Sequence, residues 1–521
     1  MIQRNTNYSI KIKHDYLINH TNMGYLGALP RGNSLKSLTQ NEKRFFKIYA
    51  SRHTIASKNN YVRLFNSIDK LKEYKELTTE KENKLSSAIY VEKNYLYNLI
   101  LECLDIYHKD SSIDRQISKY INVASVLAAK KLDEQSAKIL DKAKKISEEY
   151  NRFENIVSIT LLQKNNGFNY DTITNKELNS YYTDIFSTLQ QQDLKLKLNK
   201  TFDELLLQRR RIGPIKNEEE LIELKAQYLE TNFRVASNVN TFDGKIYLLL
   251  AKIEYYRILR DDINCRIYCL EFLSLFDLHV NRITDQIDAY IYVLNVFIVE
   301  RLYHNNRGEA DGVLKKLLSL PTLTLGKTNI NNIMIKVKIF EVYYTCITDI
   351  AIKFRDYEYA LQYIPNIENE LEKMENQMTP SFNLVLKSNI ACIYFGIMDY
   401  KKSLKWCNKI LNDPPEYRQD IFYTVKILYL IIHFELGNQV ILPSIIKSTY
   451  RHLIKRKRIY LFENIFLKYL RLFLHSETKK EQKNLFLKFK QELLPLLDNK
   501  FENLAFHDID IIGWIDKKLE N

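Results

Sequence analysis

The chain of 521 residues has a formal net charge of +14, 45% apolar residues, and only 12 glycines and 9 prolines. This length allows several cores or one extended core, and the scarcity of turn-forming residues excludes a fold rich in tight turns. The longest apolar runs are shorter than the roughly 18 residues of a membrane span, and the N-terminus lacks the apolar core of a signal peptide. The composition therefore predicts a cytoplasmic protein that does not contact a membrane.

The positive charge is concentrated in two places. Residues 1–72 hold 13 Lys/Arg against 3 Asp/Glu, a net of +10, and residues 447–471 hold 8 against 1, a net of +7. The rest of the chain sums to −3. We therefore expect a nearly neutral body with two basic segments.

Residues 1–38 are polar and weakly periodic, which predicts a mobile extension, and Met1 and Met23 are alternative starts. A basic N-terminal helical group is predicted over 39–110. It opens with Thr39 followed three residues later by Glu42, the pattern of a capping box.

From residue 111 to 521 the sequence predicts helix after helix, joined by short polar segments. The expected helices cover 112–132, 133–150, 153–163, 175–191, 193–211, 218–236, 245–260, 264–278, 283–304, 308–320, 330–354, 420–436, 443–454, 458–474, 477–497 and 504–521, the last as a capping helix. No strand-like alternation of useful length interrupts them, so the fold class is all-α.

Residues 379–415 contain two helical patterns joined by a short turn at residues 397–399. Asp399 is placed to cap the second helix, and the small residues Ala391 and Ser403 lie where two antiparallel helices approach closely. The segment that begins at Asp356 repeats this pattern 43 residues earlier. Weaker copies begin at Gly308 and Asp133.

This hairpin resembles a tetratricopeptide repeat (TPR), a helical hairpin of about 34 residues. The resemblance is carried by Ile390, Ala391, Tyr394, Asp399, Tyr400, Ser403 and Pro415. Ser403 stands where alanine is usual in that family, and Cys407 where an aromatic residue is usual. The resemblance implies an irregular right-handed α-α superhelix, a TPR-like solenoid of helical hairpins, behind the small N-terminal group.

The chain is also similar to an uncharacterised family of bacterial cytoplasmic helical-repeat proteins. That similarity rests on EKRFFKIYASRH, NNYVRLFNSID and VEKNYLYNLIL near the N-terminus and on Gly513-Trp514-Ile515 near the C-terminus. It supports the helical-repeat fold and implies no activity.

The sequence lacks the phosphate-binding, dinucleotide-binding, zinc-protease and serine-hydrolase motifs. His507 and Asp510 share a helical face, but a solvated helix start explains them without a metal. Cys265 and Cys269 are four residues apart with no second ligand pair nearby, so simple packing explains them as well. We predict no catalytic residues, no metal site and no cofactor.

Two groups of basic residues are candidate surfaces. The first is Lys447, Arg451, Lys455, Arg456, Lys457 and Arg458, and the second is Lys43, Arg44 and Lys47. If the helix around Arg451 is continuous, the first group forms a cationic ridge; if it breaks near Arg456, the group is a charged interhelical turn. Either form serves as a solvated surface or contacts phosphates.

The leading functional hypothesis is a non-catalytic scaffold or adaptor that holds a protein or peptide partner. Lys387, Asn389 and Tyr394 are the candidate residues near a peptide-binding groove. The alternative is a helical-repeat regulator whose basic N-terminal head binds nucleic acid, and an enzyme is the third class. The sequence leaves the partner and the oligomeric state open.

Overall fold

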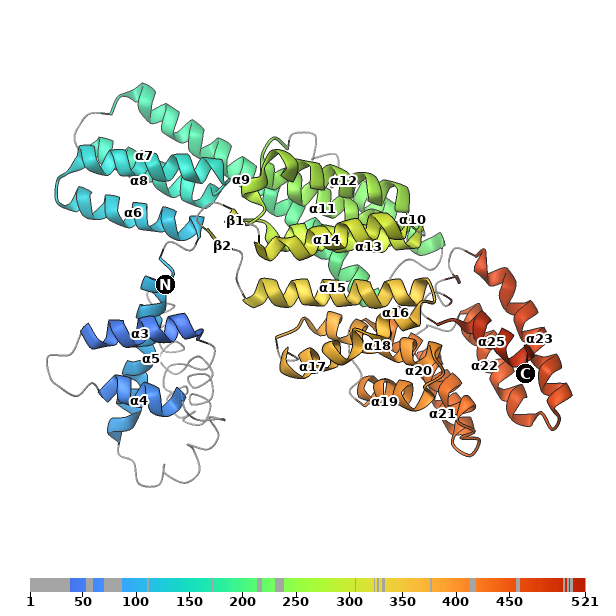
Figure 1. Ribbon diagram of the computed structural model, residues 1–521. Coiled ribbons are helices and arrows are strands. Elements are labelled where there is room, and N and C mark those ends of the chain that lie inside the picture. Colours follow the sequence, from blue (N-terminus) through green and yellow to red (C-terminus); the bar gives the residue numbers. More distant parts are fainter. Residues whose placement is uncertain are drawn as a thin grey trace, which may run out of the picture. The chain divides into compact units, whose positions relative to one another are not determined.

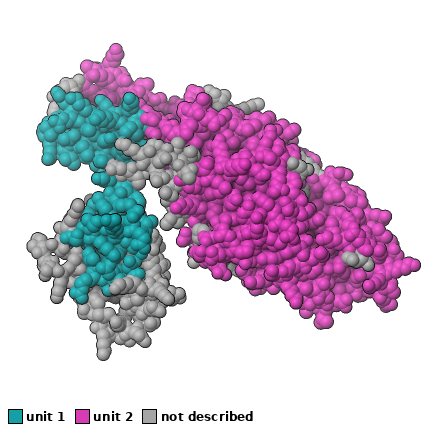
Figure 2. Space-filling model, in the orientation of Figure 1, with its two compact units in different colours: residues 1–146 teal, residues 147–521 magenta. Residues whose placement is uncertain are grey.

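The computed structural model describes residues 38–521 except 53–59, 70–86, 110–111, 170–172, 213–217, 230–238, 305, 323, 326–327, 330–332, 375–376, 413–417, 456–459, 500–501, 504–505, 507–508 and 521. The predicted extension before residue 38 lies outside this part. The chain divides into two compact units, residues 1–146 and 147–521, which Figure 2 colours separately. Each unit is described here on its own.

The first unit contains a small helical group with its own core. Its helices are α3 (Gln40–Arg52), α4 (Asn60–Asp69) and α5 (Ser87–Tyr107). Phe46 and Phe65 are fully buried and stack at a centroid distance of 4.5 Å. The predicted capping box is confirmed, because Glu42 N–H donates to Thr39 Oγ1 at 3.3 Å and Thr39 N–H donates to the Glu42 carboxylate at 2.7 Å.

The next two helices form the predicted hairpin. They are α6 (Ile113–Ala129) and α7 (Asp133–Glu149), the second of which crosses the boundary between the units. Ser136 is fully buried, and its hydroxyl donates to the Ala124 carbonyl at 2.8 Å. A small side chain therefore lets α7 approach α6 closely.

The second unit is helical throughout its described residues except for one pair of two-residue strands. Thr324 of β1 (Thr324–Leu325) lies opposite Asn329 of β2 (Thr328–Asn329) in an antiparallel pair. The α-helices are α8 (Phe153–Asn169), α9 (Asn175–Ile212), α10 (Glu218–Leu229), α11 (Phe242–Leu259), α12 (Asp262–Leu278), α13 (Ile287–Tyr303), α14 (Arg307–Ser319), α15 (Ile333–Lys353), α16 (Tyr357–Leu361), α17 (Ile364–Met374), α18 (Pro380–Gly396), α19 (Tyr400–Leu411), α20 (Gln419–Glu435), α21 (Leu442–Lys455), α22 (Leu461–His475), α23 (Lys479–Leu493) and α25 (Ile511–Glu520). Short 3-10 helices occur at Val280–Arg282, Leu320–Thr322 and Leu494–Leu497. The all-α prediction is confirmed.

Several predicted boundaries are wrong; α8, for example, continues to Asn169 where an end at residue 163 was predicted. The expected break near residue 192 is absent, because α9 is one helix of 38 residues. It packs on α8 and on α11, and its buried side chain changes from Ile185 near its start to Leu205 near its end. In the sequence pattern, this change of buried face looks like the boundary between two helices. The last helix begins at Ile511 rather than 504, where Asp510 accepts a hydrogen bond from the Gly513 N–H at 3.1 Å.

The same type of turn recurs between successive helices in the described residues. In each case a residue with a left-handed backbone is followed by one whose N–H donates to a carbonyl five residues earlier, as in a Schellman motif. At all of these turns except the one at Gly437, that following residue directly precedes the new helix. The left-handed residues are Lys131, Asn151, Arg260, Arg355, Met398 and Gly437, with φ between 52° and 69°. The matching bonds, between 2.8 and 3.0 Å, run from Leu132 to Leu127, Arg152 to Ser147, Asp261 to Tyr256, Asp356 to Ala351, Asp399 to Tyr394 and Asn438 to His433.

Replacing Met398 by glycine is expected to raise the free energy of unfolding by about 0.5–1 kcal/mol, because a non-glycine residue is disfavoured at positive φ. Met398 has φ 65° and an exposed side chain, so little packing is lost. Arg355→Gly is the contrasting variant, since Arg355 has φ 56° but also pairs with Asp510. Urea unfolding of both variants measures the difference; destabilisation by Met398→Gly would contradict the turn geometry.

In several hairpins, the residue four positions after the cap of the second helix is small. Ser136, Ala310, Ala360 and Ser403 occupy this place, and all are fully buried. The Ser403 hydroxyl donates to the Ala391 carbonyl at 2.7 Å, which explains serine where the repeat family has alanine. The predicted caps are confirmed, because Asp356 and Asp399 accept from the N–H groups of Tyr359 and Lys402.

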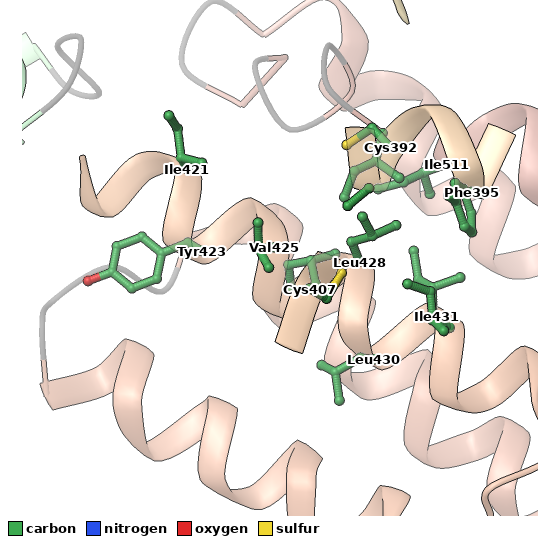
Figure 3. Close-up of a cluster of buried hydrophobic side chains, with 14 of the residues drawn as sticks. Cys392, Phe395, Cys407, Ile421, Tyr423, Val425, Leu428, Leu430, Ile431 and Ile511 are labelled. Atoms are coloured by element: carbon green, nitrogen blue, oxygen red, sulfur yellow. The ribbon is translucent and has the colours of Figure 1, made fainter. Parts of the chain in front are cut away.

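The first helices of successive hairpins lie against one another. α13 contacts α15, α15 contacts α18, and α18 contacts α20, as Figure 1 shows. These helices are buried on most sides: in α18 every residue from Ser388 to Phe395 is buried. Cys392 and Cys407 lie inside this apolar cluster (Figure 3), where they serve as small core residues.

The final helix, α25, packs back on earlier elements. The Trp514 indole N–H donates to Glu435 of α20 at 2.7 Å, and its ring lies edge-on to Phe434 and Phe486. Lys518 also pairs with Glu435 at 2.7 Å. This helix therefore closes the apolar surface at the end of α20.

Candidate functional site

The structure places two of the three predicted groove residues in the interior. Asn389 is 9% exposed, and its amide donates to Thr348 Oγ1 at 2.9 Å and to Asp349 Oδ1 at 2.6 Å, so it joins α18 to α15. Tyr394 is 7% exposed and lies beneath the ammonium group of Lys402. Lys387 is half-buried. Asn389 and Tyr394 thus stabilise packing, which corrects their assignment to an open groove surface.

Asn389 belongs to a row of polar contacts between successive first helices. Asp288 of α13 forms an ion pair with Lys338 of α15, and Cys346 of α15 lies 3.6 Å from Asn295 of α13. One residue of this row is visible in the sequence, where Asn295 interrupts an apolar run. The Asn389 amide is buried, so its two hydrogen bonds fix the register of α18 against α15, because an unpaired group there would be costly. The Asp288–Lys338 pair, by contrast, lies near the surface.

A buried ionic network lies where the α7–α8 turn meets α11. Arg282 is 3% exposed, and its guanidinium donates to Asp243, which is fully buried, at 2.7 Å. The same guanidinium lies between the rings of Tyr150 and Phe242, at 5.1 Å and 4.4 Å from their centroids. Arg282 also donates to the Glu149 carbonyl at 2.9 Å, so one side chain ties three segments together.

Further ion pairs complete this network. Lys195 of α9 lies 3.1 Å from Asp243, and Arg152 pairs with Asp285. The five charged side chains carry three positive and two negative charges. Every one of them has an opposite charge beside it, so the arrangement satisfies itself and stabilises the fold.

A second buried carboxylate lies in the middle of α11. Glu254 is fully buried and accepts from Arg209 and Arg257, each at 2.7 Å. Burial by itself raises the pKa of Glu254, but the two guanidinium groups hold it below its ordinary value. The charge of Arg209 is therefore offset by a carboxylate 45 residues away, rather than only by neighbours in sequence.

The pH dependence of stability is expected to include a contribution from His433, which is 5% exposed and whose pKa is lowered by burial. Its Nδ1 lies 2.9 Å from the Asn438 amide nitrogen, a bond that only a neutral ring accepts. The unfolded chain protonates the His433 ring more readily than the folded chain does. The free energy of unfolding is therefore highest above the unfolded pKa of about 6.5 and decreases as the pH falls below it. Between pH 7 and 5, the His433→Gln chain should therefore lose less stability than the unsubstituted chain. His475→Gln, at an exposed position, is the control; equal losses in all three chains would contradict the assignment.

The cationic ridge predicted on the helix around Arg451 is the clearest charged surface in the described part of the second unit. Lys447, Arg451 and Lys455 are exposed on one face of α21, which is continuous through Lys455. Arg456, Lys457 and Arg458 lie outside the described residues. The structure thus brings three of the six predicted cations together on a helix face.

The basic N-terminal group is partly engaged by its own neighbours. Lys43 pairs with Asp69 at 2.6 Å, and the Lys47 ammonium lies 5.7 Å from the Phe65 ring centroid. Arg44 is exposed on α3. The internal pairing of Lys43 lowers the charge available to an outside anion.

Metal and membrane sites have little support in the described residues. Within them no group of three or more His, Cys, Asp or Glu side chains is placed to hold a metal ion, and His507 lies outside them. Cys265 and Cys269 are buried together in the core around α12, where burial and the neighbouring thiol raise the pKa of Cys269. No described helix combines the length and hydropathy needed to cross a bilayer.

The charged and polar clusters of this chain are thus mostly satisfied by internal partners, while the ridge on α21 faces outward. Comparison with known proteins does not assign a role to these surfaces. No protein-family model matches the chain, and no curated protein or solved structure matches it significantly.

Proposed function

We propose that the chain is a non-catalytic protein-interaction scaffold of the cytoplasm, built from TPR-like helical hairpins stacked as an irregular right-handed superhelix. The observation that carries the proposal is the repeated turn. The same left-handed residue and five-residue hydrogen bond recur at Arg260, Arg355, Met398 and Gly437, and an aspartate cap follows at the first three. Repeated hairpins of this type bury their apolar faces only against neighbours, and the stack presents extended surfaces suited to partners.

The buried charges also support a scaffold rather than an enzyme. Arg282 and Asp243 pair with each other, and Glu254 holds two arginines. Catalytic groups need an accessible position from which to meet a substrate. These groups instead form buried ion pairs that hold neighbouring segments together.

Affinity capture with the full-length chain tests the proposal. At physiological salt we expect at least one protein to be retained in a constant ratio to the bait, and purified partner and bait to co-elute in size-exclusion chromatography. The tag alone is the control. Recovery of no protein at a constant ratio would contradict the scaffold.

The nucleic-acid alternative is supported by the exposure of Arg44 and Lys47 on α3. If these residues contact phosphates, Arg44→Glu with Lys47→Glu should weaken binding of the full chain to duplex DNA by at least about tenfold and flatten its salt dependence. Filter binding across a salt series measures both effects. Binding that is absent, or unchanged in the double variant, would remove this alternative.

A further inference from the structure

The outward face of α21 carries regularly spaced positive charge. Lys447, Arg451 and Lys455 recur every fourth residue and are exposed, so the ridge spans about 12 Å at 1.5 Å per residue. None of the three has a carboxylate partner among the described residues. Side chains four apart lie one above another on a helix, so the charges form a line.

The sequence around the ridge supplies almost no counter-charge. Residues 447–471 hold 8 Lys/Arg against 1 acidic residue. That residue, Glu463, accepts from the Tyr460 N–H at 3.0 Å at the start of α22, and Lys468 pairs with Glu492 of α23. Any carboxylate that neutralises the ridge cations therefore comes from outside residues 447–471.

The neighbouring helix adds a fourth cation. Arg471 of α22 is exposed, and its guanidinium lies 5.2 Å from the centroid of the Tyr450 ring on α21. Stacking on an aromatic ring holds a guanidinium in place. The cationic surface thus extends across two packed helices.

Apolar side chains lie at both ends of the ridge. Ile454 is 47% exposed and shares the helix face of Arg451, three residues away. Val440 and Ile441, just before α21, are 94% and 47% exposed. A partner that fills this face therefore needs carboxylates in the middle and apolar side chains at the ends.

These features favour a peptide over a nucleic acid. Single-stranded nucleic acids bind through bases stacked on exposed aromatic rings. In the described part of α21 and α22 every Tyr and Phe is buried or half-buried, and Tyr450 has Arg471 on its ring. A helix with carboxylates every fourth residue has the same charge spacing as the ridge.

We propose that the outward face of α21 binds an acidic amphipathic helix of a partner protein. The inference depends on the proposed scaffold function, and it adds the chemical class of the partner: carboxylates four residues apart that meet the ridge, flanked by apolar side chains that cover Ile454 and Val440. Helix-on-helix recognition of this type is common among peptide-binding proteins.

Fluorescence anisotropy with the full-length chain tests the proposal. The probe is a labelled peptide of roughly 18 residues in which Glu recurs every fourth position with Leu at both ends of the same face. A matched peptide replaces each Glu with Gln. We expect the Glu peptide to bind at least about tenfold more tightly, and to lose affinity between about 50 mM and 200 mM salt.

Variants locate the contact. Lys447→Glu with Arg451→Glu should weaken binding of the Glu peptide at least about tenfold. The matched control, Lys480→Glu with Lys483→Glu on exposed positions of α23, makes the same change in net charge and should leave binding within about twofold. Thermal unfolding of both variants checks that the fold is kept.

Three results would overturn the inference. They are equal binding of the Glu and Gln peptides, unchanged binding in the ridge variant, and tighter binding of a duplex or single-stranded oligonucleotide at the same salt. If the ridge variant still captures the same protein partners as the unsubstituted chain, the scaffold function holds and only the assignment to α21 fails.

Discussion

Replacing Arg282 by methionine is expected to lower the free energy of unfolding by about 3–5 kcal/mol. The guanidinium of Arg282 is 3% exposed and pairs with Asp243, which is fully buried. Methionine fills much of the same volume but leaves the Asp243 carboxylate with Lys195 as its remaining cation. Urea unfolding of the full chain, followed by circular dichroism, measures the change.

A double variant separates the charge from the packing. Asp243→Leu added to Arg282→Met removes both members of the pair, and it should restore at least half of the lost stability, because the buried Asp243 carboxylate is gone and Lys195, which loses this partner, is 20% exposed. Arg451→Met at an exposed position should change stability by no more than about 0.5 kcal/mol. If Arg282→Met and Arg451→Met have equal effects, the ionic network does not stabilise this unit.

Adding one methyl group at Gly396 is expected to lower the free energy of unfolding by about 1–3 kcal/mol. A Cβ atom at this position would overlap the ring of Tyr357, which belongs to α16 of the preceding hairpin. Gly396→Ala thus forces two stacked hairpins apart. Gly312→Ala is the matched control, because a Cβ there meets nothing and alanine favours the helix, so it should add up to about 1 kcal/mol.

The effect at Gly396 depends on Tyr357, which makes it testable by a double-mutant cycle. In a Tyr357→Leu background, Gly396→Ala should cost at least about 1 kcal/mol less than in the unsubstituted chain. Equal costs in the two backgrounds would mean that α16 and α18 do not meet at this point, against the observed packing.

The sequence predicted the elements that depend on local chemistry. Asp399 and Asp356 cap helices because a carboxylate at that position reaches the N–H group three residues on, and this requires no knowledge of the rest of the chain. The hairpin around Ser403 was likewise visible, since a small residue four positions after a cap is a local pattern. The capping box at Thr39 belongs to the same class.

The sequence failed where the answer depends on distant partners. Asp285 and Arg152 are 133 residues apart, so nothing local to either residue indicates that they pair. Asn389 was predicted to lie near a peptide-binding groove, yet α15 supplies it with Thr348 and Asp349 as buried partners. The continuity of α9 was missed because its buried face changes as its neighbour changes from α8 to α11.

Zero-length carbodiimide cross-linking, read by mass spectrometry, tests most directly whether helices pack against their neighbours in sequence order. The reagent joins lysines to carboxylates that are already in contact. The account predicts cross-links between Lys338 and Asp288, which join α15 to α13, and between Lys468 and Glu492, which join α22 to α23. Intramolecular cross-links of comparable yield between helices that do not touch in the structure, such as Asp288 to Lys468, would contradict it.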